Sequence, residues 1–198
     1  MAEDRRTRRT RRALRDALVA LILERGYAGL TVEDISERAD VARATFYSHY
    51  RDKDDLFTRI TTDLLQELDE RMQPLVGEIE VGFTGKPLLE LFSHAEQQRD
   101  LYRVILRGEG DGKALRTFSD ESVRRVAEVF RARAAQSEVE PRLPAELLAR
   151  AWVGEQLAVL HWWLEHDVPP MPAEEATRML RDLAVNGRYW ASGFTPPA

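Results

Sequence analysis

The stretch from Leu30 to Ile60 constrains this chain most, because two short helix patterns are joined there by a tight turn. Thr31 and, three residues later, Asp34 form a T-x-x-D capping box, which predicts that a short helix begins beside them. That helix should break around Asp40, because aspartate tolerates the left-handed backbone of a turn. Two short helices joined in this way are typical of a DNA-binding helix-turn-helix.

A second helix is predicted from Ala42 to Tyr50. On a 3.6-residue wheel, Phe46 lies on a face that can pack inward, while Ala44 and Ser48 lie on the opposite face. The outward face is therefore small and polar, which suits a helix that enters the major groove. Arg43 at the helix start can form a bidentate contact with a guanine.

A third helix connects this region to the rest of the chain. Asp52 and Asp55 form a second capping box, which predicts that a longer helix opens at Lys53. Apolar side chains keep helical spacing as far as Met72, until a proline and Gly77 stop the helix. One continuous helix should therefore join a small N-terminal domain to a larger one.

Basic charge is concentrated near the N-terminus. Residues 5–15 hold seven arginines and no acidic residue, which predicts a basic arm that binds DNA phosphates and continues into the first helix. The alternative is a basic tail without a role. That first helix ends at Gly26 and has a stripe of apolar residues, Leu14, Ala17, Leu18, Leu21 and Ile22. Residues 1–60 hold 13 basic and 11 acidic side chains, against 16 and 23 in residues 61–198, so nucleic acid should meet the N-terminal part.

The run TVEDISERADVARATFYSHYRDKDDLF, residues 31–57, resembles the signature of TetR-family (tetracycline-repressor-like) transcriptional regulators in residue types and spacing. The resemblance is specific over residues 14–60 and only architectural beyond them. It implies that the helix from Ala42 is the recognition helix. It also implies contacts to bases or adjacent phosphates for Arg43, Ala44, Thr45 and Tyr47, and contacts to the DNA backbone for Thr31, His49 and Lys53.

The sequence departs from the family pattern at two positions. Asp40 stands where the turn usually has glycine, which costs little if Asp40 adopts the left-handed region. Ala42 stands where the recognition helix usually has a Ser or Thr cap, and a side-chain cap is typically worth ~1 kcal/mol. Another group, or water, must then satisfy the amides at this helix end.

We predict an all-α fold class. An N-terminal basic arm and three-helix helix-turn-helix DNA-binding domain should occupy residues 1–55, and a C-terminal helical ligand-binding and dimerisation domain residues 56–198. Helical patterns in the latter cover residues 88–99, 101–107, 118–135, 145–165 and 173–189. The run GEGDG at 108–112 lacks the strand and the Lys-Ser/Thr of a P-loop, and Glu109 and Asp111 would repel anions. It is interpreted as a flexible interhelical loop.

No motif supports an enzyme, a cofactor or a metal site. The histidines show no ligand spacing, and neither a nucleophile elbow nor a dinucleotide fingerprint occurs. The chain has no cysteine, which excludes disulfides and thiolate metal sites. No run approaches the ~18 apolar residues of a membrane span, and the N-terminus lacks an apolar signal region, so we expect a cytoplasmic protein without membrane contact.

The two last predicted helices carry more apolar surface than one helical layer buries. The resemblance places a dimeric four-helix bundle there, and small Gly154 and Ala158, at i and i+4, would let helices approach closely. The resemblance also places an effector pocket among the C-terminal helices, where large aromatics and a few polar groups occur. The candidate effector-binding residues are Met72, Phe92, His94, Tyr102, Phe118, Trp152, Gln156 and His161.

These patterns together predict a homodimeric regulator of transcription that binds double-stranded DNA. They favour a repressor that a small apolar or aromatic effector releases from a pseudopalindromic operator. One alternative keeps DNA binding and gives the C-terminal domain a protein partner instead of a small molecule. A weaker alternative is a ligand-binding or catalytic helical domain whose N-terminal helices have lost DNA binding, and Arg43, Thr45, Tyr47 and Lys53 argue against it.

Overall fold

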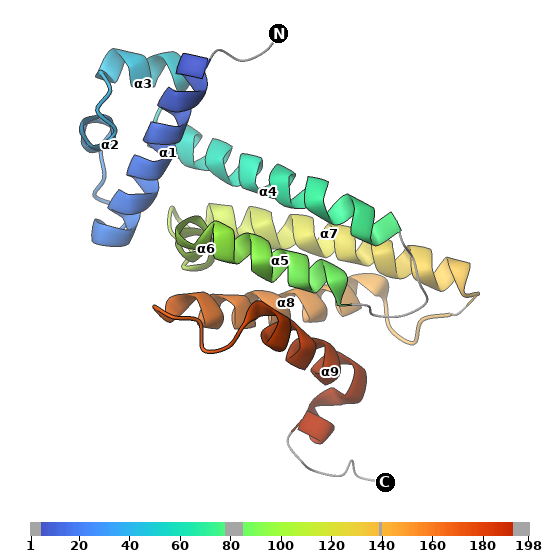
Figure 1. Cartoon of the computed structure of the whole chain (residues 1–198). Helices are drawn as coiled ribbons and strands as arrows, with labels where there is room; N and C mark the ends of the chain where they lie inside the picture. Colours follow the sequence, from blue (N-terminus) through green and yellow to red (C-terminus); the bar gives the residue numbers. More distant parts are fainter. Residues whose placement is uncertain (1–4, 78–84, 139, 192–198) are drawn as a thin grey trace. The chain divides into compact units, whose positions relative to one another are not determined.

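The predicted all-α fold class is confirmed. The computed structural model describes residues 5–77, 85–138 and 140–191, and within these ranges it contains nine α-helices and no strand (Figure 1). The helices are α1 (Arg5–Arg25), α2 (Val32–Arg38), α3 (Arg43–His49), α4 (Lys53–Gly77), α5 (Lys86–Gln97), α6 (Arg99–Leu106), α7 (Lys113–Gln136), α8 (Ala145–Glu165) and α9 (Ala173–Ala191). No helix in the described ranges is long and apolar enough to cross a membrane.

The chain divides into two compact units, and each unit combines two separate stretches of the sequence. Unit 1 comprises Met1–Glu67 together with Asp100–Phe118, and unit 2 comprises Leu68–Arg99 together with Ser119–Ala198. The helices α4 and α7 each run from one unit into the other. Nearly all of α6 therefore belongs with the N-terminal helices, although it lies far along the chain.

Unit 1 has a core built from one apolar stripe of each N-terminal helix. The predicted stripe of α1 is buried, and it is joined by one fully buried side chain from each of the next three helices. The least exposed members are Leu14, Leu18, Ile35, Phe46 and Leu56, each with 0% of its surface accessible. Burying a side chain of this size contributes about 1.5–3 kcal/mol, so these contacts fix α2 and α3 on α1.

The helix ends in the C-terminal part agree with the sequence patterns to within two residues, except at the start of α7. The helix α4 ends at Gly77 and carries Pro74 inside its last turn, where the missing proline N–H removes a single hydrogen bond. The helix α7 begins at Lys113, five residues before the predicted start at Phe118. The reason is that the Arg116 amide already donates to the Gly112 carbonyl at 2.9 Å, so the helix opens directly from the glycine run.

Unit 2 has an aromatic core. The Trp163 ring is fully buried and lies against Phe92, with ring centroids 5.4 Å apart. The indole N–H of Trp163 donates to the Met171 carbonyl at 2.8 Å, so its one polar group is satisfied after α8 has ended. Arg99 donates to the carbonyls of Leu164, at 2.8 Å, and of His166, which satisfies the end of α8.

Candidate nucleic-acid interface

The predicted capping box at the start of α2 is confirmed. The Asp34 amide donates to Thr31 Oγ1 at 3.2 Å, and the Thr31 amide donates to Asp34 Oδ2 at 2.9 Å. The hydroxyl and amide of Thr31 hold the pKa of the Asp34 carboxyl below its usual value. Two of the amides that a helix start leaves without carbonyl partners are therefore satisfied by side chains.

Two charged pairs hold α2 against α1. Arg38 of α2 forms a two-pronged contact with Glu24 of α1, at 2.8 and 2.6 Å, and this contact lowers the pKa of Glu24. Arg25 of α1 lies 3.2 Å from the Asp34 carboxylate. Exposed pairs of this kind contribute about 0–1 kcal/mol each, so they set the orientation of α2 more than the stability of unit 1.

The turn between α2 and α3 has the predicted left-handed residue. Asp40 has φ 53°, and its amide donates to the Glu37 carbonyl at 3.1 Å. The next amide, that of Val41, donates to the Ser36 carbonyl at 3.0 Å. Aspartate therefore replaces glycine here without loss of the turn.

The helix α3 starts without a side-chain cap, as the alanine at its N-cap predicts. The Ala42 carbonyl instead accepts from the amides of Thr45, at 2.8 Å, and of Phe46, at 3.2 Å. The helix is held from below by Phe46, which is fully buried, and by Tyr50, which is 6% exposed. Packing on one side, and not capping, therefore keeps α3 in place.

The outer face of α3 is open to solvent. Arg43, Ala44 and Tyr47 are exposed, Tyr47 at 52% of its surface, while Thr45 and His49 are half-buried on the flanks. The Arg43 guanidinium lies 3.7 Å from the exposed Glu33 carboxylate. Breaking such a pair costs at most about 1 kcal/mol, whereas a bidentate guanine contact is worth about 1–3 kcal/mol. Arg43 is therefore free to exchange this partner for a base.

Thr31 and Lys53, the other two candidates in unit 1, have partners inside the protein. The Thr31 hydroxyl is engaged in the capping box. The half-buried Lys53 ammonium donates to the carbonyls of Tyr27, Ala28 and Leu30 at 3.0, 3.2 and 2.9 Å, and it lies 4.5 Å from the Tyr27 ring centroid. An ammonium has three donors, so Lys53 binds the α1–α2 turn with all of them. The sequence did not predict this role.

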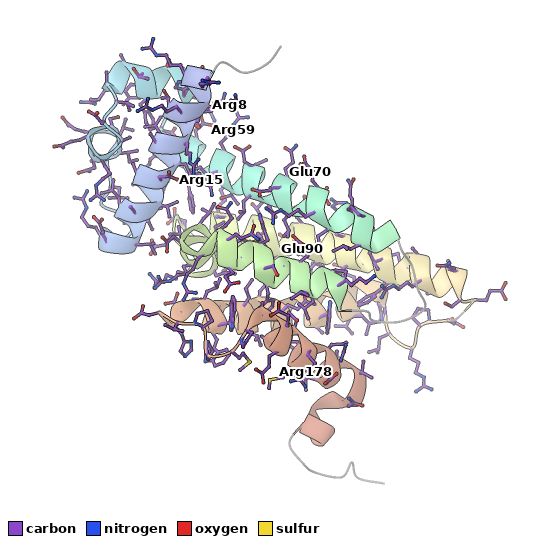
Figure 2. The ribbon with its side chains drawn as sticks, viewed as in Figure 1. Arg8, Arg15, Arg59, Glu70, Glu90 and Arg178 are labelled. Carbon is purple, nitrogen blue, oxygen red and sulfur yellow. The ribbon has the colours of Figure 1, made fainter. Side chains whose placement is uncertain are left out.

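Arginines of α1 and α4 contribute positive charge to unit 1. The helix α1 begins at Arg5, so the basic arm is helical over the described residues, and its side chains project along α1 (Figure 2 labels Arg8 and Arg15). Arg59 extends from the first turns of α4. Burial raises the pKa of the Tyr50 phenol, and the charges of Arg11 and Arg59 oppose this rise. Positive charge from both α1 and α4 therefore lies near the end of α3.

The candidate effector residues are divided between the two units. Tyr102 and Phe118 lie in unit 1, where both are buried and pack edge to face with centroids 5.6 Å apart. The remaining six lie in unit 2: Phe92, His94 and Gln156 are buried, and Met72, Trp152 and His161 are half-buried. His161 Nε2 lies 3.5 Å from Glu165 of the next helical turn. The structure therefore does not unite the eight residues in one compact unit.

The apolar residues of α8 lie on two faces. Leu157, Leu160, Trp163 and Leu164 are buried within the unit, whereas Ala151, Gly154, Ala158 and Trp162 are exposed. Leu147, at 53% exposure, extends the exposed stripe, and α9 adds Met179 and Val185 at 46% and 64%. Leu147 and Val185 were missed in the sequence, because summed apolar content does not separate the two faces of a helix. Helical spacing alone would have separated them.

A capped α2, a left-handed turn and an α3 with an open outer face define a helix-turn-helix protein. Residues 14–60 match the model of the bacterial regulatory proteins of the tetR family. Over 54 residues the chain is 46% identical to the HTH-type transcriptional regulator YxbF of Bacillus subtilis. The aligned segment covers 27% of this chain and 14% of YxbF. This chain thus spans much less than half the length of that relative.

Solved structures match along most of the chain. A putative TetR-family transcriptional regulator from Syntrophomonas wolfei has a TM-score of 0.74 and 17% identity, with coverage of 96% of this chain and 99% of that one. The transcriptional regulator FadR from Bacillus subtilis, solved in complex with stearoyl-CoA, has a TM-score of 0.72 and 20% identity, with coverage of 89% and 98%. Residues 14–60 therefore carry the sequence pattern of the tetR family, and the chain shares its fold with TetR-family regulators along most of its length.

Proposed function

We propose that the protein is a homodimeric repressor of transcription that binds a pseudopalindromic operator and is released from it by a small-molecule effector. The observation that carries the proposal is the outer face of α3, where Arg43, Ala44 and Tyr47 are exposed while Phe46 is fully buried behind them. A recognition helix needs this combination, because base edges are read by side chains that the fold has not already engaged.

The arginines of α1 support a second set of contacts, to phosphate. Arg5, Arg8, Arg9 and Arg12 are exposed. Contacts of this kind carry no sequence information but make binding depend on salt, with a slope of roughly −0.9 in log K against log salt for each phosphate neutralised. The proposed interface therefore combines a short reading helix with a basic helix that strengthens binding to any sequence.

Selection of duplexes from a random-sequence library tests DNA binding directly. The expected result is one enriched motif with two inverted half-sites, with their centres about one helical turn or more apart. Titration of the selected duplex at several salt concentrations should then show a binding constant that falls steeply as salt increases. A library that shows no enrichment, with equal weak binding to every duplex, would refute operator recognition.

The exposed stripe of α8 supports the dimer. Gly154 lies in the middle of this stripe, and a Cβ added there would meet nothing within 4 Å in the protomer. Gly154→Glu should therefore leave the protomer folded but place a charge in the proposed helix-helix interface. Gly154→Ala is the matched control and should remain dimeric. Light scattering at micromolar concentration measures both, and a monomeric parent protein would favour a protein partner for this face instead.

Buried polar side chains in unit 2 support an effector site. His94 and Gln156 are buried among the aromatic and aliphatic core residues of unit 2. The likeness in fold to FadR, which was solved with stearoyl-CoA, makes long-chain acyl-CoA thioesters the first effectors to test. A typical coupling free energy of ~1–3 kcal/mol would lower operator affinity about 5- to 150-fold.

Calorimetry of acyl-CoA thioesters of increasing chain length, with and without the selected operator, tests this part. Linkage requires that operator DNA weaken ligand binding by the same factor by which ligand weakens operator binding. Equal ligand affinities with and without operator would mean that the thioester is not the signal, however tightly it binds. Free coenzyme A is the control for the contribution of the acyl chain.

A further inference from the structure

The GEGDG run between α6 and α7 has a defined shape. Four of its five residues are left-handed, with φ of 74° at Gly108, 65° at Gly110, 58° at Asp111 and 68° at Gly112. The Gly112 amide donates to the Gly108 carbonyl at 2.9 Å, and the Arg116 guanidinium donates to the Asp111 carbonyl at 2.8 Å. Glycine adopts this region without steric cost, so Asp111 is the residue of the run for which a left-handed backbone is unusual. The predicted interhelical loop is therefore closed by hydrogen bonds of its own.

The loop contacts the α1–α2 turn through a side chain. The Tyr27 amide donates to Glu109 Oε2 at 3.0 Å, across 82 positions of sequence. Tyr27 follows Gly26, whose φ of 75° ends α1. A part-buried amide just beyond a helix needs an acceptor, and a carboxylate makes one of the stronger hydrogen bonds available to it.

The loop also packs against the start of α4. A Cβ at Gly110 would lie 3.0 Å from Phe57 Cε1, 3.1 Å from Phe57 Cδ1 and 3.6 Å from Tyr27 Cε1. The rings of Tyr27 and Phe57 contact each other, with centroids 5.4 Å apart. Glycine at 110 is therefore required both by its left-handed φ and by the close approach of the Phe57 ring.

The same turn is held from α4 by a charged side chain. Lys53 donates to the carbonyls of Tyr27, Ala28 and Leu30, so the turn accepts hydrogen bonds from α4 while its Tyr27 amide donates to the α6–α7 loop. All of these residues belong to unit 1. The helix α7 then continues past Phe118 into unit 2. The chain thus has a second connection to the helix-turn-helix besides α4.

We propose that Glu109 and Gly110 form a latch that fixes the helix-turn-helix on α6 and the start of α7, and that operator binding by two protomers depends on it. Glu109 is a positioning residue, since it acts on the α1–α2 turn and not on DNA. The inference rests on the proposed DNA-binding function. A released helix-turn-helix still reads one half-site, but it no longer holds its recognition helix at a fixed place, and two half-sites bind together only when both are correctly placed.

Hydrogen exchange tests the latch without DNA. In Gly110→Ala and Glu109→Ala the Tyr27 amide should exchange roughly 10-fold faster or more, because its hydrogen bond to a charged acceptor is lost. Gly108→Ala is the matched control: its φ of 74° makes alanine equally strained, but the added Cβ meets only ordinary contacts, at 3.9 and 4.0 Å. Glu109→Gln keeps an oxygen acceptor and should restore most of the protection. Equal exchange at Tyr27 in Gly110→Ala and Gly108→Ala would overturn the latch.

Titration with operator DNA tests the role of the latch in DNA binding. Gly110→Ala and Glu109→Ala should lose roughly 10-fold in affinity for the full operator while affinity for a duplex with one half-site stays within about 2-fold, because only the double engagement needs fixed placement. Gly108→Ala and Glu109→Gln should behave like the parent protein on both duplexes. Equal losses on both duplexes would reduce the loop to a merely structural part of unit 1. If the parent protein binds no duplex, the proposed function fails, and hydrogen exchange still decides whether the latch exists.

Discussion

The helices α2 and α3 are both seven residues long, but they are held in opposite ways. The helix α2 has a complete capping box and two charged pairs to α1. The helix α3 has no side-chain cap, and its fully buried residue is Phe46. The difference shows how a short helix is kept in place while its outer side chains remain uncommitted: the apolar anchor lies on the inner face, and the polar groups are left for a partner.

Removal of Phe46, the apolar anchor of α3, should have the largest effect on stability and on DNA binding. Phe46→Ala leaves a cavity under α3 and should lower the free energy of unfolding of unit 1 by about 3–5 kcal/mol. Operator binding should be lost with it. Tyr47→Ala, one position along and exposed, is the control and should change stability by less than about 0.5 kcal/mol. Urea unfolding followed by circular dichroism measures both, and similar losses in the two variants would contradict the inner-anchor model.

Loss of an outer side chain should affect DNA binding and leave folding intact. Arg43→Ala should cost ~1–3 kcal/mol of operator affinity and relax base preference at one position per half-site. Its stability should stay near that of the parent protein, because the pair with Glu33 is exposed. Titration against operator variants measures the preference. A uniform loss across all variants would assign Arg43 to phosphate contact instead.

Loss of the side-chain cap of α2 should have a smaller effect than loss of Phe46 or of the Arg43 side chain. Thr31→Ala removes the side-chain half of the capping box and should cost ~1 kcal/mol of stability. The variant should also make Asp34 titrate closer to its usual pKa, since the Thr31 hydroxyl is the largest cause of its depression. Because a lowered carboxyl pKa gives stability that is present at neutral pH and lost as the pH falls through it, the difference between the variant and the parent should shrink under acid conditions. Urea titrations at pH 7 and pH 3 measure this; a constant difference would contradict it.

Addition of a cap to α3 gives the smallest expected effect. Ala42 has the extended backbone of an N-cap residue, with φ −65° and ψ 143°, but no side chain that accepts a hydrogen bond. Ala42→Ser should stabilise unit 1 by up to ~1 kcal/mol. Ala42→Val, which lacks an acceptor, is the control. If serine gives no more stability than valine, water already satisfies this helix end as well as a side chain would.

The sequence predicted the parts of this comparison that depend on near neighbours. The Thr31–Asp34 box, the left-handed Asp40 and the missing cap at Ala42 each involve residues within four positions of one another. Local spacing determines such features, so a single sequence is sufficient to find them.

Contacts between distant positions were not predictable in the same way. The Glu109 bond to Tyr27 spans 82 positions, and Lys53 reaches carbonyls 23 to 26 positions away. From the sequence, Glu109 is interpreted only as an acidic residue of a glycine-rich loop, and Lys53 as a contact to the DNA backbone at a helix start. Neither propensity nor periodicity tells which distant backbone a charged side chain will meet, and folding alone supplies that partner.

The engagement of Lys53 also determines how the protein should react with acylating reagents. The chain has three lysines, and Lys86 and Lys113 are exposed while Lys53 is half-buried with its ammonium against three carbonyl oxygens. An activated ester must reach the amine nitrogen to react with it, and the Lys53 nitrogen lies against three carbonyl oxygens of the α1–α2 turn. Lys86 and Lys113 should therefore be acylated first, and the rate of acylation at Lys53 reports how often the α1–α2 turn opens.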